Sequence, residues 1–255
     1  WLAIYPHFLG TFTSWLHGYI ANPFLGFIIN KSIDMPDRKL KIIDSSCDSD
    51  FLSNFKTKYS YGKLEKIQAN YFSYDIKIKK FRYNDGRENR NELEFANQYQ
   101  LKNEYIEDDL KKTKSKFWRR NFFTYDDIEY LTYYLLKNKP FIAKYLAKRF
   151  PFVIIDECQD LSYVQLSILN GLHKYGTRIH LVGDLNQAIY SFRNIEPADT
   201  KSFINQNQFK EMRLIENYRS NQAIVDISGR VVNRKNYVVG KKRANHQQPS
   251  CCVAL

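Results

Sequence analysis

Several features of secreted and membrane-bound proteins are missing from this chain of 255 residues. Its four cysteines show no zinc-ligand spacing, and two of them, Cys251 and Cys252, are adjacent, a placement that seldom forms a structural disulfide. No stretch is long and uncharged enough to span a bilayer, and the first residues lack the basic lead and small-residue cleavage site of a signal peptide. We therefore expect a reduced, cytoplasmic setting and no membrane partner.

The chain also has no internal repeats. Its first residue is Trp1 and not a methionine. The length allows one large domain or two small ones with a substantial core. We expect the chain to be a piece of a longer protein.

Positive charge is abundant. The chain has 39 Lys and Arg against 27 Asp and Glu, which gives a formal net charge of +12 and a pI of about 9.4. This excess favours a polyanionic partner, of which nucleic acid is the commonest. Nineteen Tyr and eighteen Phe add rings that could stack on bases, although most of them will lie in the core.

An acidic pair follows directly on a short apolar run. Residues 152–155 are Phe-Val-Ile-Ile, and Asp156 and Glu157 come next. A run of this length predicts a strand buried on both faces in a parallel sheet, and ligands gather at the carboxyl ends of such strands. Two carboxylates there suit phosphoryl transfer, with one holding Mg²⁺ and the other activating water. The alternative is a strand followed by the acidic first turn of a helix.

The surrounding pattern predicts an α/β fold. A capping box at residues 124–127 starts a helix, Pro140 ends it, and a second helix runs to Arg149. Apolar residues at helical spacing follow from residue 161 to 172. Further buried strands are predicted at residues 179–182, with His180 in the core, and at 212–215. Strands alternating with helices favour a parallel sheet covered by helices.

Residues 31–116 differ in character, being polar and rich in lysine, asparagine and tyrosine. Residues 74–81 alternate like a half-exposed strand, residues 84–86 supply a turn, and residues 88–116 read as a charged helix. We interpret the segment as an inserted subdomain whose charge either contacts nucleic acid or is only a solvated face. Near the N-terminus, Thr13 or Ser14 is predicted to cap a helix.

Three blocks, residues 153–160, 181–193 and 214–220, together resemble the ATPase core of the UvrD/Rep family of helicases in order and spacing. Residues 10–14 are similar to a shorter family motif on the face that binds single-stranded DNA. The resemblance implies a RecA-like parallel sheet covered by helices, with an inserted mixed or helical subdomain. We assign residues 1–30 and 117–234 to a first RecA-like domain, 31–116 to the insertion and 235–255 to a basic, loosely ordered tail.

The resemblance also implies roles for single residues in binding ATP and Mg²⁺. Asp156 matches the carboxylate that holds Mg²⁺, and Glu157 matches the catalytic base. Gln187 matches the glutamine that senses the terminal phosphate. Tyr218 matches the aromatic residue packed on the adenine, and Arg219 matches the arginine that contacts the γ-phosphate, where a guanidinium suits spreading charge.

Contacts to single-stranded or partly unwound DNA are implied for a second set of residues, Thr11, Phe12, Tyr190, Phe192 and Arg193. The family usually has Trp where this chain has Phe192, which still offers a stacking face. For Tyr190 and Phe192 the alternative is packing in the core.

The chain departs from the family pattern because no G-x-x-x-x-G-K-[ST] sequence, the loop that cradles phosphates, occurs in it. Either it is a fragment of an ATP-dependent, 3′ to 5′ DNA helicase or translocase, or it is a catalytically incomplete nucleic-acid-binding remnant. Its N-terminal residues and insertion look most like the UvrD-like component of Gabija-type anti-phage systems. That placement implies a nuclease partner and a role as a sensor of DNA ends, and DNA repair is the other role considered.

Overall fold

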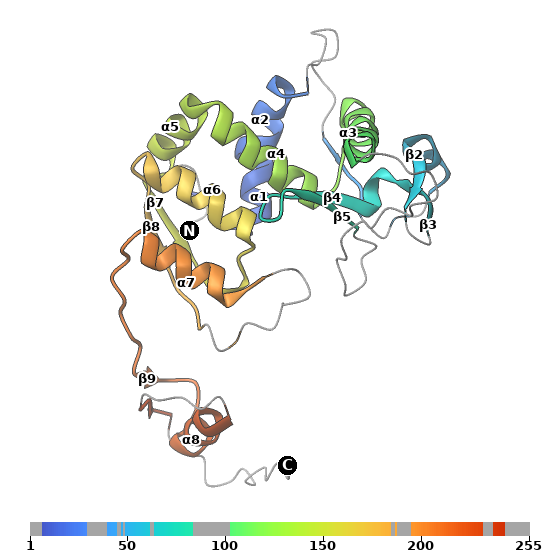
Figure 1. Cartoon of the computed structure of the whole chain (residues 1–255). Helices are drawn as coiled ribbons and strands as arrows, with labels where there is room; N and C mark the ends of the chain where they lie inside the picture. The colour runs from blue at the N-terminus through green and yellow to red at the C-terminus, as the bar shows by residue number, and fades with distance from the viewer. Residues whose placement is uncertain are drawn as a thin grey trace. The chain divides into compact units, whose positions relative to one another are not determined.

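The computed structural model describes residues 7–29, 40–44, 47, 49–61, 64–83, 103–184, 187, 195–231 and 237–242. The chain divides into two compact units, Trp1–Phe203 and Ile204–Leu255, and each is described by itself. The first holds parallel strands and helices of the predicted α/β class (Figure 1). Among the described residues, no helix is both long and apolar enough to cross a membrane.

A broken helical segment opens the first unit. Its parts are α1 (Phe12–Leu16), the π-helical turn η1 (His17–Ala21), α2 (Asn22–Phe24) and the 3₁₀ turn η2 (Leu25–Phe27). The cap is Thr11, not Thr13 or Ser14 as predicted, because the Thr11 hydroxyl accepts a hydrogen bond from the backbone N–H of Ser14 at 3.1 Å. An N-cap bonds the third residue after it, so the cap must lie outside the helix.

Three helices form the main core with this segment. They are α4 (Tyr125–Asn138), α5 (Pro140–Arg149) and α6 (Tyr163–Lys174), and they pack on one another (Figure 1). The predicted capping box of α4 is confirmed, with Thr124 and Asp127 bonding each other's backbone N–H groups. α4 ends before Pro140, as predicted, but α5 begins at Pro140 itself, one residue earlier than the predicted start at Phe141, since proline is favoured at the first helical position.

Strands β7 (Phe152–Ile155) and β8 (Arg178–Leu181) pair in parallel, as predicted, with Ile155 opposite Leu181. The prediction that β7 is buried on both faces is wrong, because Phe152 is 53% and Ile154 61% exposed while Val153 packs on the core. His180 is also exposed rather than in the core, and its ring lies 4.6 Å from that of Phe152. Burial of a strand depends on what covers each face, which the apolar run itself does not encode.

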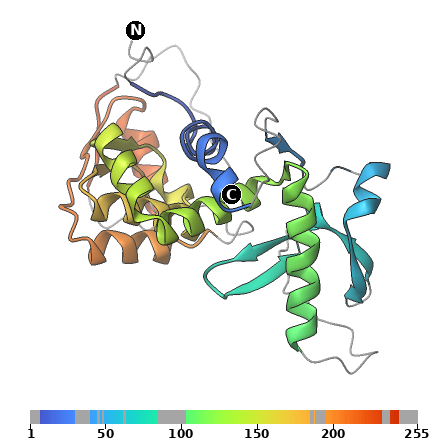
Figure 2. The same ribbon diagram turned by 90° about the horizontal axis from the view of Figure 1, so that it is seen from above.

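A second parallel pair lies near the two ends of the segment predicted to be an insertion. There β1 (Lys41–Ile42) pairs with β6 (Phe122–Phe123). The remaining elements are η3 (Asp50–Phe55), β2 (Lys56–Tyr61), β3 (Leu64–Gln68), η4 (Ala69–Tyr71), β4 (Phe72–Asp75), β5 (Lys80–Tyr83) and α3 (Asn103–Arg119). Figure 2 shows α3 beside these strands. Ile106 and Leu110 of α3 form a small core with Phe72.

The predicted single strand at residues 74–81 is instead a hairpin. β4 and β5 pair antiparallel through a turn at residues 76–79, where Lys79 has a φ of 59°. The Asp75 carboxylate accepts hydrogen bonds from the backbone N–H groups of Lys77 (2.8 Å) and Ile78 (3.4 Å), which favours a turn over continued extension. The turn predicted at residues 84–86 and the first part of the predicted helix lie outside the described residues.

The second unit contains short elements with little burial. α7 (Pro197–Gln206) crosses the division between the units, and β9 (Glu216–Asn217), α8 (Gln222–Val231) and β10 (Val239–Gly240) follow. The strand predicted at residues 212–215 is wrong: the segment is not extended in a sheet, and Met212 and Leu214 are each 84% exposed. At its end the carbonyl of Ile215 accepts a hydrogen bond from the N–H of Val239 at 2.8 Å, where the short β9–β10 pair begins.

Candidate nucleotide site

The turn after β7 places the acidic pair at the strand end. Asp156 and Glu157 are both exposed, and Glu157 has a left-handed backbone with a φ of 52°, uncommon for a residue other than glycine. The 3₁₀ turn η6 (Cys158–Asp160) follows. The N–H of Cys158 donates to the carbonyl of Val182 at 2.9 Å, which ties this turn to the end of β8. Strain of this kind persists where the surroundings hold it, often at functional sites.

A hydrogen-bonded chain connects the two strand ends. Gln159, only 2% exposed, donates from Nε2 to Glu157 Oε2 at 2.6 Å and accepts at Oε1 from the N–H of Asp184 at 3.1 Å. Gln187 donates from Nε2 to Asp184 Oδ2 at 3.2 Å. The structure therefore brings together Glu157 and Gln187, two of the predicted site residues, through two residues to which the sequence analysis gave no role.

Gly183 lets these strand ends approach closely. A Cβ atom there would lie 2.3 Å from Gln159 Oε1 and 3.0 Å from the backbone nitrogen of Cys158. Such contacts leave no room for a side chain. A glycine directly before an aspartate at a strand end was the sequence signal for this approach, but glycine is common enough in turns that the signal is weak.

Electrostatics around the turn reflect crowding of acidic groups. Burial raises the pKa of the Cys158 thiol, and the charges of Glu157, Asp156 and Asp160 raise it further, so the thiol stays protonated and unreactive. Burial also raises the pKa of Asp160, with Glu157 adding to the effect. The charge of Glu157 thus acts on both Cys158 and Asp160 within this short turn.

The donor set at the strand end fits a magnesium ion held mainly by a substrate. Asp156 is exposed, and its Oδ1 accepts from the N–H of Glu157 at 3.0 Å. Within the described part of the chain, no group of three or more His, Cys, Asp or Glu side chains could hold a metal by itself. Mg²⁺ ordinarily takes one or two carboxylates, with phosphate oxygens and water completing its shell.

Two predicted nucleotide contacts lie in the second unit. The Tyr218 ring is 72% exposed, and its hydroxyl donates to Glu216, which raises the pKa of Tyr218. Arg219 is exposed, and its backbone N–H donates to Asn217 Oδ1 at 2.9 Å. The structure therefore shows how Tyr218 and Arg219 are held within their own turn. That turn belongs to the second unit, whereas Glu157 belongs to the first.

The predicted DNA contacts are only partly described. Tyr190, Phe192 and Arg193 lie outside the described residues. Thr11 is exposed but uses its hydroxyl as the cap of α1. Phe12 is half-buried, packs against the main core and lies 5.8 Å from Trp15 between ring centroids. Its ring thus serves packing at least in part.

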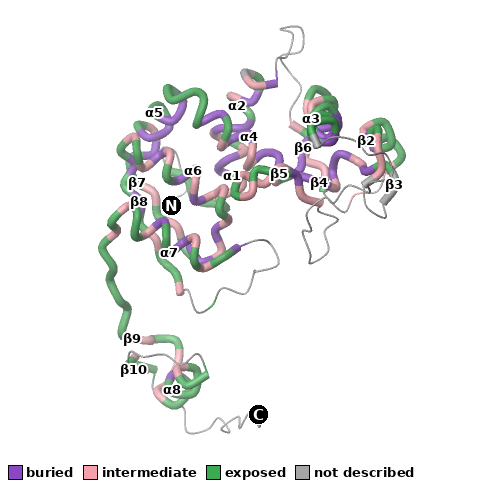
Figure 3. The backbone as a smooth tube through the Cα atoms, viewed as in Figure 1, coloured by how far each residue is buried: buried purple, intermediate pink, exposed green. Residues whose placement is uncertain are grey.

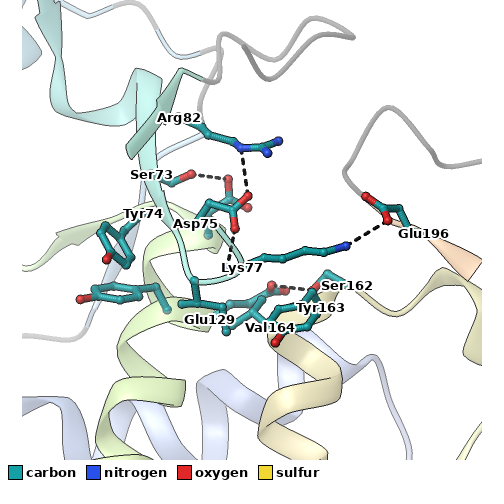
Figure 4. Close-up of a pocket in the computed structure, with 13 residues that line it drawn as sticks. Ser73, Tyr74, Asp75, Lys77, Arg82, Glu129, Ser162, Tyr163, Val164 and Glu196 are labelled. Carbon is teal, nitrogen blue, oxygen red and sulfur yellow. Dashed lines mark hydrogen bonds and ion pairs between the residues drawn. The ribbon is translucent and has the colours of Figure 1, made fainter. Parts of the chain in front are cut away.

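A pocket separate from the strand ends lies where the β4–β5 hairpin meets α4 and α6 (Figure 4). Its volume of about 80 Å³ is far below the 300 Å³ or more typical of ligand sites, so a nucleotide would not fit. Lys77 extends across it to Glu196 (3.0 Å) and Asp199 (2.9 Å). Burial alone would lower the pKa of Lys77, but the hydrogen bonds with Asp199 and Glu196 raise it overall. The ion pairs of Lys77 thus connect the β4–β5 hairpin to the start of α7 beside this pocket.

The parallel strands, covering helices and strand-end carboxylates define a domain of the nucleotide-binding α/β class. The model of the UvrD/REP helicase N-terminal domain matches residues 24–208, more than half of the chain. The chain therefore belongs to the family of UvrD/REP helicase N-terminal domains.

Curated helicases show distant, partial similarity. The chain is 31% identical over 119 residues to ATP-dependent DNA helicase PcrA of Leuconostoc citreum, covering 46% of this chain and 16% of PcrA. It is 27% identical over 201 residues to exonuclease/helicase subunit RexA of Lactococcus lactis subsp. cremoris (strain MG1363), covering 76% and 15%. For DNA helicase II of Escherichia coli (strain K12), the identity is 31% over 106 residues, covering 41% and 15%. The chain thus spans only a small part of each relative.

Proposed function

We propose that this chain is the part of an ATP-dependent DNA helicase or translocase that positions the attacking water and couples hydrolysis to movement on single-stranded DNA. The observation that carries the proposal is the hydrogen-bonded chain Glu157–Gln159–Asp184–Gln187 across the ends of β7 and β8. Through these hydrogen bonds Glu157, at the end of β7, is connected to Gln187, the other residue predicted to face the phosphate. Membership of the helicase family supports the same conclusion.

Each predicted residue has a chemical task in this proposal. Asp156 would hold Mg²⁺, which neutralises charge on the phosphates when it is bound. Glu157 takes the proton from the attacking water, and Gln187 orients that water against the terminal phosphate. Tyr218 stacks on the base, and the Arg219 guanidinium faces the charge that develops on the transferred phosphoryl group.

Binding of single-stranded DNA is proposed for Thr11, Phe12, Tyr190, Phe192 and Arg193. Gln187 and Phe192 belong to one short segment that follows β8, so nucleotide and DNA would each bias the same element. We also propose a cytoplasmic setting, which the free cysteines Cys47 and Cys158 support among the described residues.

A nuclease partner is a finer hypothesis. It is supported by the similarity to the exonuclease/helicase RexA of Lactococcus lactis described above. The Gabija-type placement finds no support among the relatives described above, and neither anti-phage defence nor DNA repair is favoured by an observation on this chain.

The decisive experiment replaces Glu157 in the longest protein that contains this chain. Glu157→Gln should leave ATP binding nearly intact and lower DNA-stimulated turnover about a hundredfold or more, because the general base is lost. Asp156→Ala should instead weaken binding of Mg-ATP. A matched control is Glu107→Gln, since Glu107 is an exposed α3 carboxylate whose described partner is Lys111. Near-normal turnover of the Glu157 variant would remove the proposed base.

The same assay tests the alternative of a nucleic-acid-binding remnant. Because no phosphate-loop sequence occurs in the 255 residues, we expect this chain alone to show no significant ATP turnover. If the longest protein also binds DNA without hydrolysing ATP, the remnant is the better description.

A further inference from the structure

The outward face of α5 carries an alternating row of aromatic and basic side chains. Phe141, Lys144, Tyr145 and Lys148 follow the spacing i, i+3, i+4, i+7, so they share one side of the helix. All four are exposed, Phe141 at 61% and Tyr145 at 59%. The opposite side holds the helix in the main core through Ile142, Ala143 and Leu146, and Ala147 on that side is also buried.

The charge along this part of the chain has one sign. No Asp or Glu occurs between residues 130 and 155, and the exposed Lys137 and Lys139 precede α5 directly. An ordinary solvated helix mixes both signs, as α3 does, where Lys111 pairs with Glu107 and Lys112 with Asp108. Among the residues that the structure describes, no acidic side chain pairs with Lys144 or Lys148, so the α5 face presents positive charge together with large exposed rings.

Two side chains of the α5 face lie against neighbouring aromatic rings. The Tyr145 ring meets Phe24 edge-on, with centroids 6.5 Å apart and planes at 71°. Lys144 Nζ lies 5.8 Å from the centroid of Tyr175. A single exposed aromatic residue would need no explanation, but two on one helical face, alternating with lysines, form a surface with a definite chemistry.

We propose that the α5 face (Phe141, Lys144, Tyr145 and Lys148) binds single-stranded nucleic acid. The lysines pair with phosphates and the rings stack on bases, a combination that recurs in proteins that bind single strands without sequence preference. The site is additional to the predicted DNA contacts at Thr11, Phe12, Tyr190, Phe192 and Arg193. It rests on the proposed function, which it deepens by extending the DNA path, and it does not depend on ATP turnover.

The test measures binding of this chain to a fluorescent oligothymidine of about 20 nucleotides, by anisotropy, over a range of salt concentrations. Phe141→Ala with Tyr145→Ala should weaken binding about fivefold or more at every salt concentration, because stacking does not depend on counterions. Lys144→Ala with Lys148→Ala should reduce the slope of log K against log salt by about 1.4, since each phosphate contact to a single strand contributes about 0.7. On duplex DNA of equal length the ring variant should bind like the unaltered chain.

Matched controls separate this surface from general positive charge. On α3, Lys111→Ala with Lys112→Ala removes two lysines that already have acidic partners, and Tyr105→Ala removes a ring that is 57% exposed. Neither should alter affinity or slope. Tyr145→Phe retains the stacking face and should preserve binding, whereas Tyr145→Leu retains only apolar packing against Phe24 and should weaken it. Thermal unfolding of each variant identifies any loss that comes from misfolding.

Three results would overturn the proposal. Unaltered binding by both α5 variants would show that the face is only solvated. Equal losses in the α3 and α5 variants would assign binding to overall charge. Displacement of the oligonucleotide by polyglutamate as effectively as by unlabelled DNA would mean that the face recognises acidic protein instead. Each leaves the role of Glu157 in turnover untouched, so the two proposals fail separately.

Discussion

The two units hold their predicted site residues in different ways. In the first, the turn after β7 is bonded to β8 through the N–H of Cys158 and the buried side chain of Gln159. In the second, the turn that carries Tyr218 and Arg219 rests on the side chain of Asn217 and a two-residue strand. Val225 is the only buried hydrophobic residue described in the second unit, whose backbone is largely exposed (Figure 3).

This difference shows that a motif can be present in the sequence without contacts that fix its side chains in space. The family match at residues 24–208 includes the first block and not the second. The first block is held by a neighbouring strand, whereas the Tyr218 hydroxyl in the second bonds Glu216 two residues away. Hydrogen bonds to a paired strand and burial of a polar linker restrict Glu157, whereas Tyr218 and Arg219 are restricted only within their own turn. A catalytic group held by its surroundings loses less entropy on reaching its reacting geometry.

The largest expected effect comes from the buried ion pair of the first unit. Lys114 and Asp127 are 0% and 1% exposed, and Lys114 Nζ lies 2.7 Å from Asp127 Oδ1. Burial lowers the pKa of Lys114, while the charge of Asp127 and its hydrogen bond with Lys114 oppose the shift. Asp127→Ala should reduce the free energy of unfolding by about 3–5 kcal/mol, because it leaves a buried charge without its partner. Urea unfolding followed by tryptophan fluorescence measures it, since Trp1, Trp15 and Trp118 all belong to the first unit.

A double variant distinguishes the cost of an unpaired charge from the cost of losing a contact. Lys114→Met with Asp127→Asn removes both charges, and the asparagine oxygen can still accept the N–H of Thr124 that Asp127 accepts at 3.0 Å. We expect most of the lost stability to return. A double variant as unstable as Asp127→Ala alone would show that the charge is not the cause.

The next effect concerns the close approach of the two strand ends. Gly183→Ala places a Cβ atom 3.0 Å from the backbone nitrogen of Cys158 and should cost about 1–3 kcal/mol, because the backbone itself must shift. The matched control is Gly171→Ala in α6, where nothing lies within 4 Å of the added atom. That change should stabilise the protein by about 0.5–1 kcal/mol, since alanine is the better helix former. Thermal unfolding checks this: a lower melting temperature for Gly183→Ala and a higher one for Gly171→Ala support the comparison. A shift of both in the same direction contradicts it.

Replacing Gln159 removes the hydrogen bond that orients Glu157 but leaves both carboxylates at the end of β7 in place. In the longest protein, Gln159→Ala should lower kcat for ATP about tenfold or more while KM changes little, because Glu157 loses the group that orients it. Gln165→Ala is the control: Gln165 caps α6 and donates to Glu129 at 2.6 Å. It should lower stability by a similar amount and leave kcat near normal. Equal losses of kcat would make Gln159 a merely structural residue.

Local signals accounted for much of the fold. The capping box at Thr124, the proline at residue 140 and the apolar spacing of α6 each specify structure through contacts within a few residues, and all three were confirmed. The errors share a different cause. The burial of Phe152 and His180 depends on what covers each face of a strand, and the hairpin turn depends on how the Asp75 side chain bonds.

In the candidate site, too, some residues could be predicted from local sequence and others depend on contacts between distant segments. The acidic pair at a strand end follows from the apolar run before it, whereas the link through Gln159 follows from the pairing of β7 with β8. A buried glutamine that bonds a residue far along the chain has no periodic signature in the sequence. Residues of this kind are found only once the strands are placed side by side.

The smallest expected effect lies in the second unit. Asn217 Oδ1 accepts hydrogen bonds from the N–H groups of Arg219 and Ser220, both at 2.9 Å. Asn217→Ala should therefore speed hydrogen exchange at these two amides, while the tryptophan-monitored unfolding of the first unit changes by less than about 0.5 kcal/mol. Asn217→Asp keeps the accepting oxygen and should preserve slow exchange. A fall in unfolding free energy as large as that of Gly183→Ala would mean that the two units unfold together, and the contrast between a supported block and an unsupported one would then be lost.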